Sequence, residues 1–387
     1  MNRRTIHILM ILIILIINLL VPMKNFAEGE LNIKAKSAIL MDYNTRKVIY
    51  EQNPNEKLYP ASLTKIMTLI LGMEALESGK ISLTDEVRIS AHAASMGGSQ
   101  LWLEEGEVQT VENLFKAITI RSANDAAVAL AEHIAGSEEI FVKMMNEKAK
   151  EIGMNNTNFV NASGLHHENH YTTAYDVALM SAELLKHEKM HDWLTIYMDE
   201  MLVGKKKDKV QSLVNTNRLL KEYDGTTGIK TGSTSQAGYC LSASAKKGNL
   251  HLIAVIMGSD TSKIRFEESM RLLDYGFANY DSVPIGRKGD VISKVLVQKG
   301  NSQYLEVVLE KDCYLLLPKG QSKEISKETV LPEYVESPIK NGDVIGELIV
   351  KIEGKEVERV NLVAKNDVER ASIKDIFLKL LSNFINN

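Results

Sequence analysis

The chain has 387 residues, of which 44% are hydrophobic and 25% are charged, and these proportions indicate a globular protein of about two domains. Its net charge of -4 gives no indication of nucleic-acid binding, so we expect no nucleic acid among its partners. The two cysteines, Cys240 and Cys313, lie far apart in the sequence, and we place them in different domains and expect no disulfide between them.

The N-terminal segment, residues 1–27, has the composition of a secretory signal peptide. Arg3 and Arg4 precede an almost wholly apolar stretch over residues 6–21, and the segment offers a cleavage site after Ala27. Asn25 is not the small residue expected two positions before such a site, so an uncleaved signal anchor is the alternative, although the stretch is short for a membrane span. In both cases we expect the body of the protein to lie outside the cytoplasm.

Residues 35–50 predict a β-hairpin, because two short β-forming runs flank the turn-rich segment 42–46. A helix is then expected to begin near Pro60 and to end before Gly79. This helix is apolar on nearly all sides, which indicates that it is buried inside its domain.

Ser62 and Lys65 lie three residues apart, on one face of this expected helix. Burial disfavours the charged form of a lysine, and a neutral lysine amine can take the proton of a serine that attacks a carbonyl. Both residues also have ordinary interpretations, since serine often caps a helix and lysine often reaches from a buried helix to water. The same spacing recurs at residues 244–247 and 337–340, so this motif alone is weak evidence for catalysis.

A second polar motif is expected at a break between two helices. One helix begins at Thr110 and another covers residues 126–134. Ser122 and Asn124 lie between them, where a break can direct polar side chains into a cleft. Helix capping is the ordinary explanation of serine and asparagine at such a position, so this motif also needs support from elsewhere in the chain.

Further helices are expected over residues 141–152 and 175–187, with a polar surface loop between them. His166, His167 and His170 lie in this loop, where histidines are usually solvated. No cysteine or carboxylate cluster stands near them at a familiar ligand spacing, so we expect no metal site there.

The last part of this domain is expected to be a β-hairpin followed by a helix. A glycine-rich segment, residues 224–233, precedes two β-forming runs at 239–245 and 250–257. A helix over residues 266–277 then closes the domain.

The glycine-rich segment contains a third polar motif. We place Lys230 at the start of the first strand of the hairpin, with Thr231 beside it. Gly232 would let another backbone approach closely. A cation and a hydroxyl at an exposed strand edge suit an extended peptide that ends in a carboxylate, although an ordinary exposed lysine and threonine explain the same residues.

The three motifs stand in the order found in penicillin-binding proteins and serine β-lactamases. Ser-x-Asn and Lys-Thr-Gly each occur once in the chain, so the joint match is strong where each part is weak. The resemblance extends from about Leu31 to the C-terminus, and it is closest to the low-molecular-mass D-alanyl-D-alanine carboxypeptidases. The segments that resemble this family are residues 60–68, 122–126, 161–166, 224–232 and 265–268.

The resemblance implies a mixed α/β (α+β) fold for residues 31–280, in which a five-stranded antiparallel sheet is covered by helices beside an all-helical part. It also implies an enzyme that removes the terminal D-alanine from peptidoglycan stem peptides ending in D-Ala-D-Ala. Such an enzyme is acylated by penicillin and other β-lactams, and it needs no metal or other cofactor.

The resemblance further implies that Ser62 is the acylated nucleophile, Lys65 is its base and Ser122 relays a proton to the leaving D-alanine. Water would then hydrolyse the acyl-enzyme. Backbone N–H groups of Ser62 and Ser233 would form the oxyanion hole. The residues expected to bind the substrate are Asn124 at the peptide, Lys230 and Thr231 at the terminal carboxylate, and Gly232 and Ser233 beside them.

A serine β-lactamase is the nearest alternative, because class A enzymes place a glutamate between the second and third motifs. Glu151 loosely imitates that spacing, but we interpret it as a helix-end residue because Gly153 follows it. A β-lactamase would also normally end near Phe277. A non-catalytic cell-wall scaffold is the other alternative, although every motif residue is present.

Residues 281–366 predict a small β-sandwich like the second domain of the same carboxypeptidases. They contain no catalytic constellation, so we expect a spacer or a protein-contact role. The β-forming runs are 291–297, 304–309, 313–317, 345–352 and 356–363.

The C-terminal segment, residues 371–387, predicts an amphipathic helix. Docking on its own core is the ordinary role of a terminal helix, but the preceding domain is β-rich and already compact. We therefore expect an interfacial membrane anchor, as in the resembled family, and a protein held peripherally at the outer face of the cell membrane. The apolar residues at helical spacing are Ile373, Ile376, Phe377, Leu380, Leu381, Phe384 and Ile385.

Overall fold

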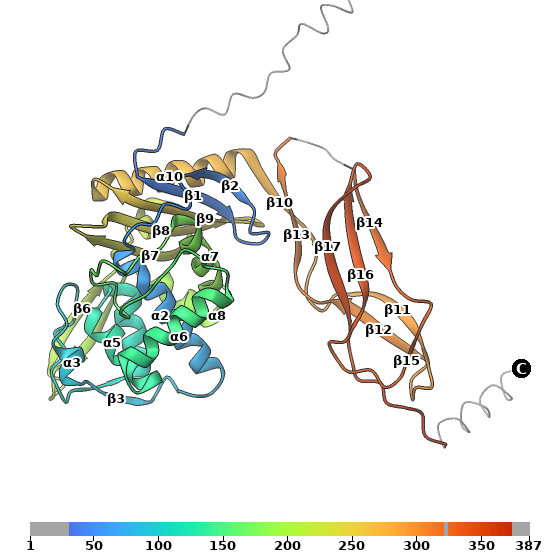
Figure 1. Cartoon of the computed structure of the whole chain (residues 1–387), viewed down its shortest axis with the longest axis horizontal. Coiled ribbons are helices and arrows are strands. Elements are labelled where there is room, and N and C mark those ends of the chain that lie inside the picture. Colours follow the sequence, from blue (N-terminus) through green and yellow to red (C-terminus); the bar gives the residue numbers. More distant parts are fainter. Residues whose placement is uncertain (1–30, 321–323, 374–387) are drawn as a thin grey trace, which may run out of the picture. The chain divides into compact units, whose positions relative to one another are not determined.

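The structure is a computed structural model that describes residues 31–320 and 324–373 (Figure 1). The chain divides into two units, residues 1–34 and 35–387. Only residues 31–34 of the first unit are described, and they form neither helix nor strand.

A five-stranded antiparallel sheet forms the centre of the N-terminal domain, in the order β2-β1-β9-β8-β7 (Figure 1). Both predicted hairpins are confirmed, and β9 joins them because it pairs with β1 on one side and β8 on the other. β9 is buried along its whole length, as its apolar sequence requires. The strands are β1 (Ser37–Asp42), β2 (Val48–Gln52), β7 (Thr226–Thr234), β8 (Gly238–Lys247) and β9 (Leu250–Ser259).

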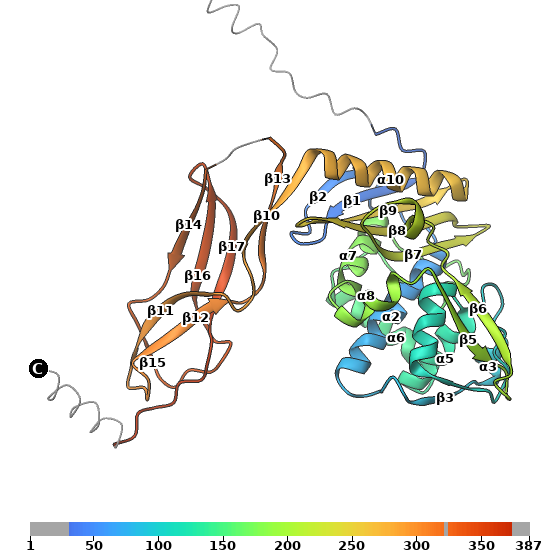
Figure 2. The same ribbon diagram turned by 180° about the vertical axis from the view of Figure 1, so that it is seen from behind.

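Helices cover both faces of this sheet (Figures 1 and 2). α10 (Ser262–Asn279) packs on β8 and β9, whereas α7 (Ala174–Leu184) packs on β1 and β9 from the opposite face. Both helices begin at threonine caps, since the hydroxyls of Thr173 and Thr261 accept backbone N–H groups of their first turns. The two predicted helices are thereby confirmed, and α10 begins earlier than the sequence indicated.

Most of the remaining helices lie on the side of the sheet that α7 covers (Figure 1), whereas the short helix Leu219–Glu222 packs with Phe266 of α10. At their centre is α2 (Lys65–Glu77), which is almost wholly buried, as predicted. It begins after Pro60 and ends before Gly79, but its first turn, η1 (Ala61–Thr64), is a 3-10 helix. The other helices are α3 (Ala91–Ala94), α4 (Val111–Lys116), η2 (Ala117–Arg121), α5 (Asn124–Ala135), α6 (Glu138–Glu151), α8 (Glu188–Leu194) and α9 (Leu219–Glu222).

A hairpin of β5 (Met198–Val203) and β6 (Lys209–Val214) is present that the sequence did not predict. Its inner face packs on the domain, and its outer face carries the exposed apolar side chains of Met198, Leu202 and Val210. Because both faces are apolar, the alternation that marks a half-buried strand is hidden in the sequence. A second small pair consists of β3 (Glu86–Arg88) and β4 (Val108–Thr110).

The described part of the C-terminal domain is built from two sheets. One has six strands in the order β14-β16-β17-β12-β11-β15, and the other is the pair β10-β13. The two sheets enclose one hydrophobic core, to which Ile285 and Leu315 come from the pair and Val307, Val350 and Leu362 from the larger sheet. The predicted β-rich domain of packed sheets is therefore confirmed.

All five predicted β-runs of this domain are strands, and three strands were missed. Of these, β14 is exposed along most of its length, so its sequence carries no buried stripe. The strands are β10 (Tyr280–Gly286), β11 (Val291–Gln298), β12 (Tyr304–Leu309), β13 (Cys313–Pro318), β14 (Ile325–Val330), β15 (Tyr334–Glu336), β16 (Val344–Ile352) and β17 (Lys355–Ala364).

The two cysteines are free and buried, and they lie in different domains as predicted, Cys240 in β8 and Cys313 in β13. Among the described residues, no helix is both long enough and apolar enough to cross a membrane. The expected signal peptide, residues 1–27, lies outside the described residues, and the expected anchor helix is described only as far as Ile373. Both therefore stay predictions.

Candidate active site

The turn that carries Ser62 is strained immediately before the serine. Ala61 has φ = 48°, in the left-handed region that alanine seldom occupies. Ser62 follows within the 3-10 turn, and its hydroxyl lies 3.1 Å from the Nζ atom of Lys65, the first residue of α2. The predicted shared face is confirmed, because one helical turn stacks the amine beside the hydroxyl.

The Lys65 amine is fully buried and surrounded by three oxygen atoms. Asn124 Oδ1 lies 2.6 Å from Nζ, the carbonyl oxygen of Ser163 lies 2.5 Å away, and Ser62 Oγ completes the set. Burial, and then the positive charge of Lys230, lower the pKa of Lys65 well below its ordinary value. The structure therefore favours a neutral amine at this position.

A neutral amine has two N–H bonds and one lone pair, and this count fixes its orientation. The two short contacts, to Asn124 and Ser163, use both N–H bonds. The lone pair of Lys65 then faces the hydroxyl of Ser62, whose contact is the longest of the three. In this state the serine O–H donates to the amine, as deprotonation of a nucleophile requires.

The second motif lies where one helix gives way to another. α4 continues as the π-helical turn η2, and Ser122 ends that turn at φ = 63°. α5 then begins at Asn124, whose Nδ2 donates to the carbonyl oxygen of Gly97 at 2.6 Å. This bond fixes the amide so that its oxygen faces Lys65. The predicted helix break is confirmed, and both Ser122 and Asn124 are buried.

Asp125 is a residue of the site whose importance the sequence interpretation missed. Its buried carboxylate accepts the backbone N–H groups of Leu101 and Leu103 at 2.9 and 3.1 Å, and that of Ala126 at 2.9 Å. Burial raises the pKa of Asp125. The two bonds on either side of Trp102 fix the loop that contacts Asn124, and they hold Trp102 at φ = 58° with its indole exposed. A carboxylate directly before the apolar run of residues 126–131 was the available signal.

Lys230 lies in the middle of β7, which corrects the prediction that it starts a strand. The glycine-rich segment is itself the edge strand of the sheet, because it pairs with β8 along its length. Two of its glycines lie where other segments pack closely against the strand. A Cβ at Gly228 would lie 3.2 Å from Leu194, and one at Gly232 would lie 2.9 Å from the backbone nitrogen of Ser62. Lys230 is also buried, which argues against the ordinary alternative of an exposed lysine on an edge strand.

Two positively charged residues, Lys230 and Arg265, lie on and beside this strand. Burial, and then the charge of Arg265, lower the pKa of Lys230 to about 7. Lys230 Nζ donates to the carbonyl oxygen of Thr231 at 3.1 Å, and the hydroxyl of Thr231 donates to Thr216 Oγ1 at 2.6 Å. Arg265 of α10 donates to the carbonyl oxygen of Gly232 at 2.9 Å. The arrangement suits an anionic ligand, because a carboxylate would stabilise the charged lysine.

The third motif lies directly against the turn that carries Ser62. A Cβ at Gly232 would stand 3.0 Å from the carbonyl oxygen of Pro60 as well as close to the Ser62 nitrogen, so the predicted close approach is confirmed. Ser233 follows on the same strand and is exposed. The structure thus brings Ser62, Lys65, Asn124 and Gly232 together. Lys230 lies close enough for its positive charge to lower the pKa of Lys65.

The loop at 161–166, noted from the sequence only as a family likeness, completes the surroundings of the lysine. Asn161 Oδ1 accepts the backbone N–H groups of Ser163 and Gly164 at 3.2 and 2.7 Å, and this turn directs the Ser163 carbonyl oxygen at Lys65. Gly164 has φ = 83°, and a Cβ there would overlap the carbonyl oxygen of Ala61. The loop therefore packs against the Ser62 turn at backbone distance.

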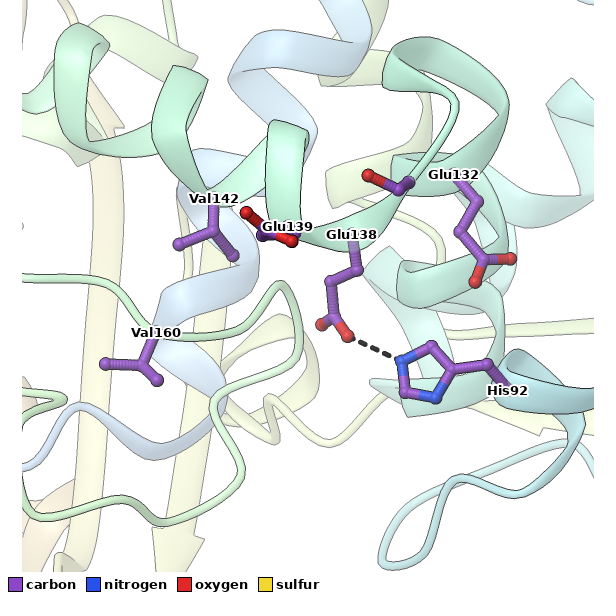
Figure 3. A pocket seen from close by; sticks show the side chains of 7 residues that line it. His92, Glu132, Glu138, Glu139, Val142 and Val160 are labelled. Atoms are coloured by element: carbon purple, nitrogen blue, oxygen red, sulfur yellow. Dashed lines mark hydrogen bonds and ion pairs between the residues drawn. The ribbon is translucent and has the colours of Figure 1, made fainter.

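Glu138, at the start of α6, holds the same loop from another direction (Figure 3). Its Oε1 accepts the backbone N–H of Ala162 at 2.8 Å, and its Oε2 lies 2.7 Å from Nε2 of His92 in α3. Glu138 thus connects the loop that orients Lys65 to the segment before Gly97, which orients Asn124. The pocket around it is lined by His92, Glu132, Ser137, Glu138, Glu139, Val142 and Val160.

His170 is buried, which corrects the prediction of a solvated histidine, whereas His166 and His167 are exposed. Its Nε2 lies 2.9 Å from Thr64 Oγ1, and its Nδ1 accepts the backbone N–H of Val160 at 3.3 Å. The imidazole can be buried because both ring nitrogens are paired. Burial, and then the charges of His167 and His166, lower the pKa of His170 to about 4. In the described ranges, no group of histidine, cysteine and carboxylate side chains could hold a metal ion.

Glu151 is the last residue of α6, and it pairs with Lys148 at 2.6 Å. Its interpretation as a helix-end residue is confirmed. The glutamate that class A β-lactamases use for deacylation therefore has no counterpart at this position.

Two family models match the chain. The model of D-alanyl-D-alanine carboxypeptidase matches residues 24–261, and the model of the penicillin-binding protein 5 C-terminal domain matches residues 280–370. Among solved structures, penicillin-binding protein 5 from Haemophilus influenzae is similar with a TM-score of 0.73 and 35% identity, over 87% of this chain and 98% of that one. Penicillin-binding protein D2 from Listeria monocytogenes, in its ampicillin-bound form, is similar with a TM-score of 0.57 and 30% identity, over 64% and 98% of the two chains.

Curated relatives match over nearly the same length. The chain is 46% identical over 344 residues to the D-alanyl-D-alanine carboxypeptidase DacF of Bacillus subtilis, which covers 89% of this chain and 88% of that protein. It is 36% identical over 350 residues to DacC of Escherichia coli, over 87% and 85% of the two chains. With a serine and a buried lysine in contact at the start of α2 and these matches, the chain belongs to the D-alanyl-D-alanine carboxypeptidase family.

Proposed function

We propose that this protein is a serine-type D-alanyl-D-alanine carboxypeptidase that removes the terminal D-alanine from peptidoglycan stem peptides through an acyl-enzyme on Ser62. Family membership supports the reaction and the penicillin binding that accompanies it. One observation carries the assignment of residues: the buried Lys65 amine has two short contacts that leave its lone pair facing the Ser62 hydroxyl.

Acylation begins with attack of Ser62 Oγ on the carbonyl carbon of the penultimate D-alanine. The serine proton passes to Lys65 Nζ, a new C–O bond forms, and the carbonyl electrons move to the oxygen. The resulting ammonium has three N–H donors, and the three oxygen atoms already placed around Nζ accept all of them. The same three oxygen atoms therefore form hydrogen bonds with both the neutral and the charged form of the Lys65 amine.

The oxyanion is stabilised by the backbone N–H groups of Ser62 and Ser233 in this proposal. The support is the close approach at Gly232, which brings the strand of Ser233 to within backbone distance of the serine turn. A larger residue at Gly232 would separate the two segments, and both donors could then no longer reach one oxygen atom.

The leaving D-alanine must receive a proton as its C–N bond breaks. We assign this step to Lys65, with the hydroxyl of Ser122 as the relay. Ser122 is buried and lies two residues from Asn124, whose amide contacts the lysine. Water then attacks the acyl-enzyme with Lys65 acting again as base, and Ser62 recovers its proton.

The terminal carboxylate of the substrate is assigned to Lys230 and Thr231. β7 is the edge strand of its sheet, so an extended peptide can lie along it with its carboxylate at these two side chains. The pKa of Lys230, lowered to about 7, leaves the lysine partly neutral at pH 7. A bound carboxylate favours the charged form, so substrate binding and protonation of Lys230 support each other.

Penicillin labelling tests the proposal. Incubation with penicillin followed by mass mapping should place one penicilloyl group on the peptide that contains Ser62, and Ser62→Ala should carry none. Ser244→Ala is the matched control, because Ser244 and Lys247 have the same spacing but lie in β8, where residues three apart face opposite sides. Labelling that persists in Ser62→Ala would overturn the assignment.

We further propose that the enzyme is exported and held at the outer face of the cell membrane. The support is the sequence pattern of residues 1–27 and the apolar stripe within residues 371–387. An enzyme placed there would meet its substrate, because the stem peptides of peptidoglycan lie outside the cytoplasm. The C-terminal domain would act as a spacer between the anchor and the site.

A further inference from the structure

A chain of three hydrogen bonds runs from the buried His170 to the residue before the nucleophile. Val160 N–H donates to His170 Nδ1 at 3.3 Å, and His170 Nε2 lies 2.9 Å from Thr64 Oγ1. The hydroxyl of Thr64 in turn donates to the carbonyl oxygen of Ala61 at 2.9 Å. His170 and Thr64 are both buried, so water cannot replace these bonds.

The direction of every bond in this chain is determined. A backbone N–H can only donate, so His170 Nδ1 must be the unprotonated nitrogen of the ring. In a neutral imidazole Nε2 then carries the hydrogen and donates to Thr64 Oγ1. Thr64 keeps its own hydrogen for Ala61, whose carbonyl oxygen can only accept. One tautomer and one protonation state therefore satisfy all three contacts.

The end of the chain is the strained point of the active site. Ala61 has φ = 48°, and a conformation of this kind persists only where its surroundings hold it. Gly164 packs against the same carbonyl oxygen from one side and Gly232 packs near the Ala61 Cβ from the other. The hydroxyl of Thr64 is the side-chain donor that fixes the direction of the carbonyl.

We propose that His170 is a positioning residue for the nucleophile: as the neutral Nε2–H tautomer it fixes the Thr64 hydroxyl, which holds the Ala61 carbonyl and so the turn that presents Ser62 to Lys65. The proposal rests on the assignment of Ser62 as nucleophile. It explains why a histidine of the 155–170 loop is buried while its neighbours His166 and His167 remain exposed.

Burial, and then the positive charges around it, explain why this histidine stays neutral. A second ring proton on Nδ1 would point at the Val160 N–H and break that contact. His167 and His166 in its own loop add to the effect of burial, as does Lys65 on the packed helix whenever its amine carries a proton. Burial with these charges lowers the pKa of His170 to about 4, so the chain of bonds persists at neutral pH.

The kinetic test uses Thr64→Val, which keeps the shape of the side chain and removes the middle of the chain of bonds. The rate constant of penicilloylation at saturating penicillin should fall about tenfold or more per active site, with the half-saturating concentration little changed. Thr64→Ser restores the hydroxyl and should recover most of the rate. A purely structural role would lower the melting temperature and leave the rate per folded molecule as in the wild type.

Thr172→Val is the matched control. Thr172 is also buried, lies close to His170 in the sequence and uses its hydroxyl in a bond of 2.7 Å to Thr157 Oγ1, away from Ala61. This variant should lose a similar amount of thermal stability and keep the wild-type rate of penicilloylation. Equal rates for Thr64→Val and the wild type would overturn the proposal, whereas absence of labelling in the wild type would overturn the assignment of Ser62 instead.

A spectroscopic measurement tests the tautomer of His170 directly in the wild-type protein. The ¹⁵N shifts of the histidine rings of the full chain, assigned with His170→Asn, should show His170 as a neutral Nε2–H tautomer at pH 6. Its ring should begin to titrate only near pH 4. A protonated ring at pH 6, or a neutral ring with its hydrogen on Nδ1, would overturn the proposal.

Discussion

Lys230 allows carboxylate recognition to be tested by pH as well as by mutation. Its pKa is lowered to about 7, by burial and then by Arg265, so the charged form should predominate well below pH 7 and the neutral form well above it. The recognition of a substrate carboxylate needs the charged form. Recognition should therefore be strongest well below pH 7 and be lost as the pH rises through that value.

The magnitude follows from the kind of bond that is removed. A hydrogen bond between charged groups contributes about 1.5–3 kcal/mol, so Lys230→Ala should lower kcat/KM about 10- to 100-fold for a peptide that ends in D-Ala-D-Ala. The same peptide with a C-terminal amide has no carboxylate to lose. Its kcat/KM should respond much less to this substitution.

The assay is the ratio of kcat/KM for the acid peptide to that for the amide, measured between pH 6 and pH 9. Because kcat/KM reports the ionisation of the free enzyme, the state of Lys65 multiplies both values equally and cancels in the ratio. The ratio should fall with rising pH in the wild type and be small and constant in Lys230→Ala. Lys230→Arg should keep a high ratio without the pH dependence, since a guanidinium stays charged in this range.

A ratio that does not change with pH in the wild type would refute the assignment of Lys230. So would an unchanged ratio in Lys230→Ala, because the carboxylate would then be bound elsewhere. If the ratio is high in Lys230→Ala but falls with pH in the wild type, another group with a pKa near 7 is responsible for the preference.

Two further predictions concern the loop beside the nucleophile and the C-terminal tail. Gly164→Ala should reduce penicilloylation more than tenfold, because its Cβ would overlap the Ala61 carbonyl oxygen, whereas Gly136→Ala, at the similar φ of 81° with no atom within 4 Å, should cost only about 1–2 kcal/mol of stability; equal loss of labelling in the two variants would contradict this. Deletion of residues 371–387 should release the enzyme from membranes without changing penicillin binding, and high salt should not release the full chain, as cell fractionation will show. A truncated protein that still sediments with membranes would assign the attachment to residues 1–27.

The elements that the sequence predicted well are those with a strong local pattern. α2 is apolar on nearly every side between a proline and a glycine, and β9 is an uninterrupted apolar run, so both were located from their own residues. The three motifs were also found, because helical spacing alone brings Ser62 and Lys65 together. Local information was sufficient for these features.

The features that the sequence did not reveal depend on partners far along the chain. β7 contains glycines that usually mark turns, and only the approach of Leu194 and of the Ser62 turn explains why they stand in a strand. In the sequence His170 resembles the other polar residues of its loop, and only its contact with Thr64 in the folded chain distinguishes it. Asp125 is similar, since its three donors include two from a loop that precedes it in the sequence. Pairings of this kind leave no periodic signal.

The order of strands in the central sheet has a consequence for how the protein is made. β1 pairs with β9, so the sheet cannot close until residue 259 has left the ribosome, and contacts between such distant parts of a chain form slowly during folding. Ser62 and Lys65 are synthesised early, but the nascent chain still lacks the Ser163 carbonyl oxygen, the Asn124 amide and the edge strand β7. In the growing polypeptide the hydroxyl of Ser62 therefore has ordinary reactivity. A fragment that stops before β7 should react with β-lactams no faster than free serine does.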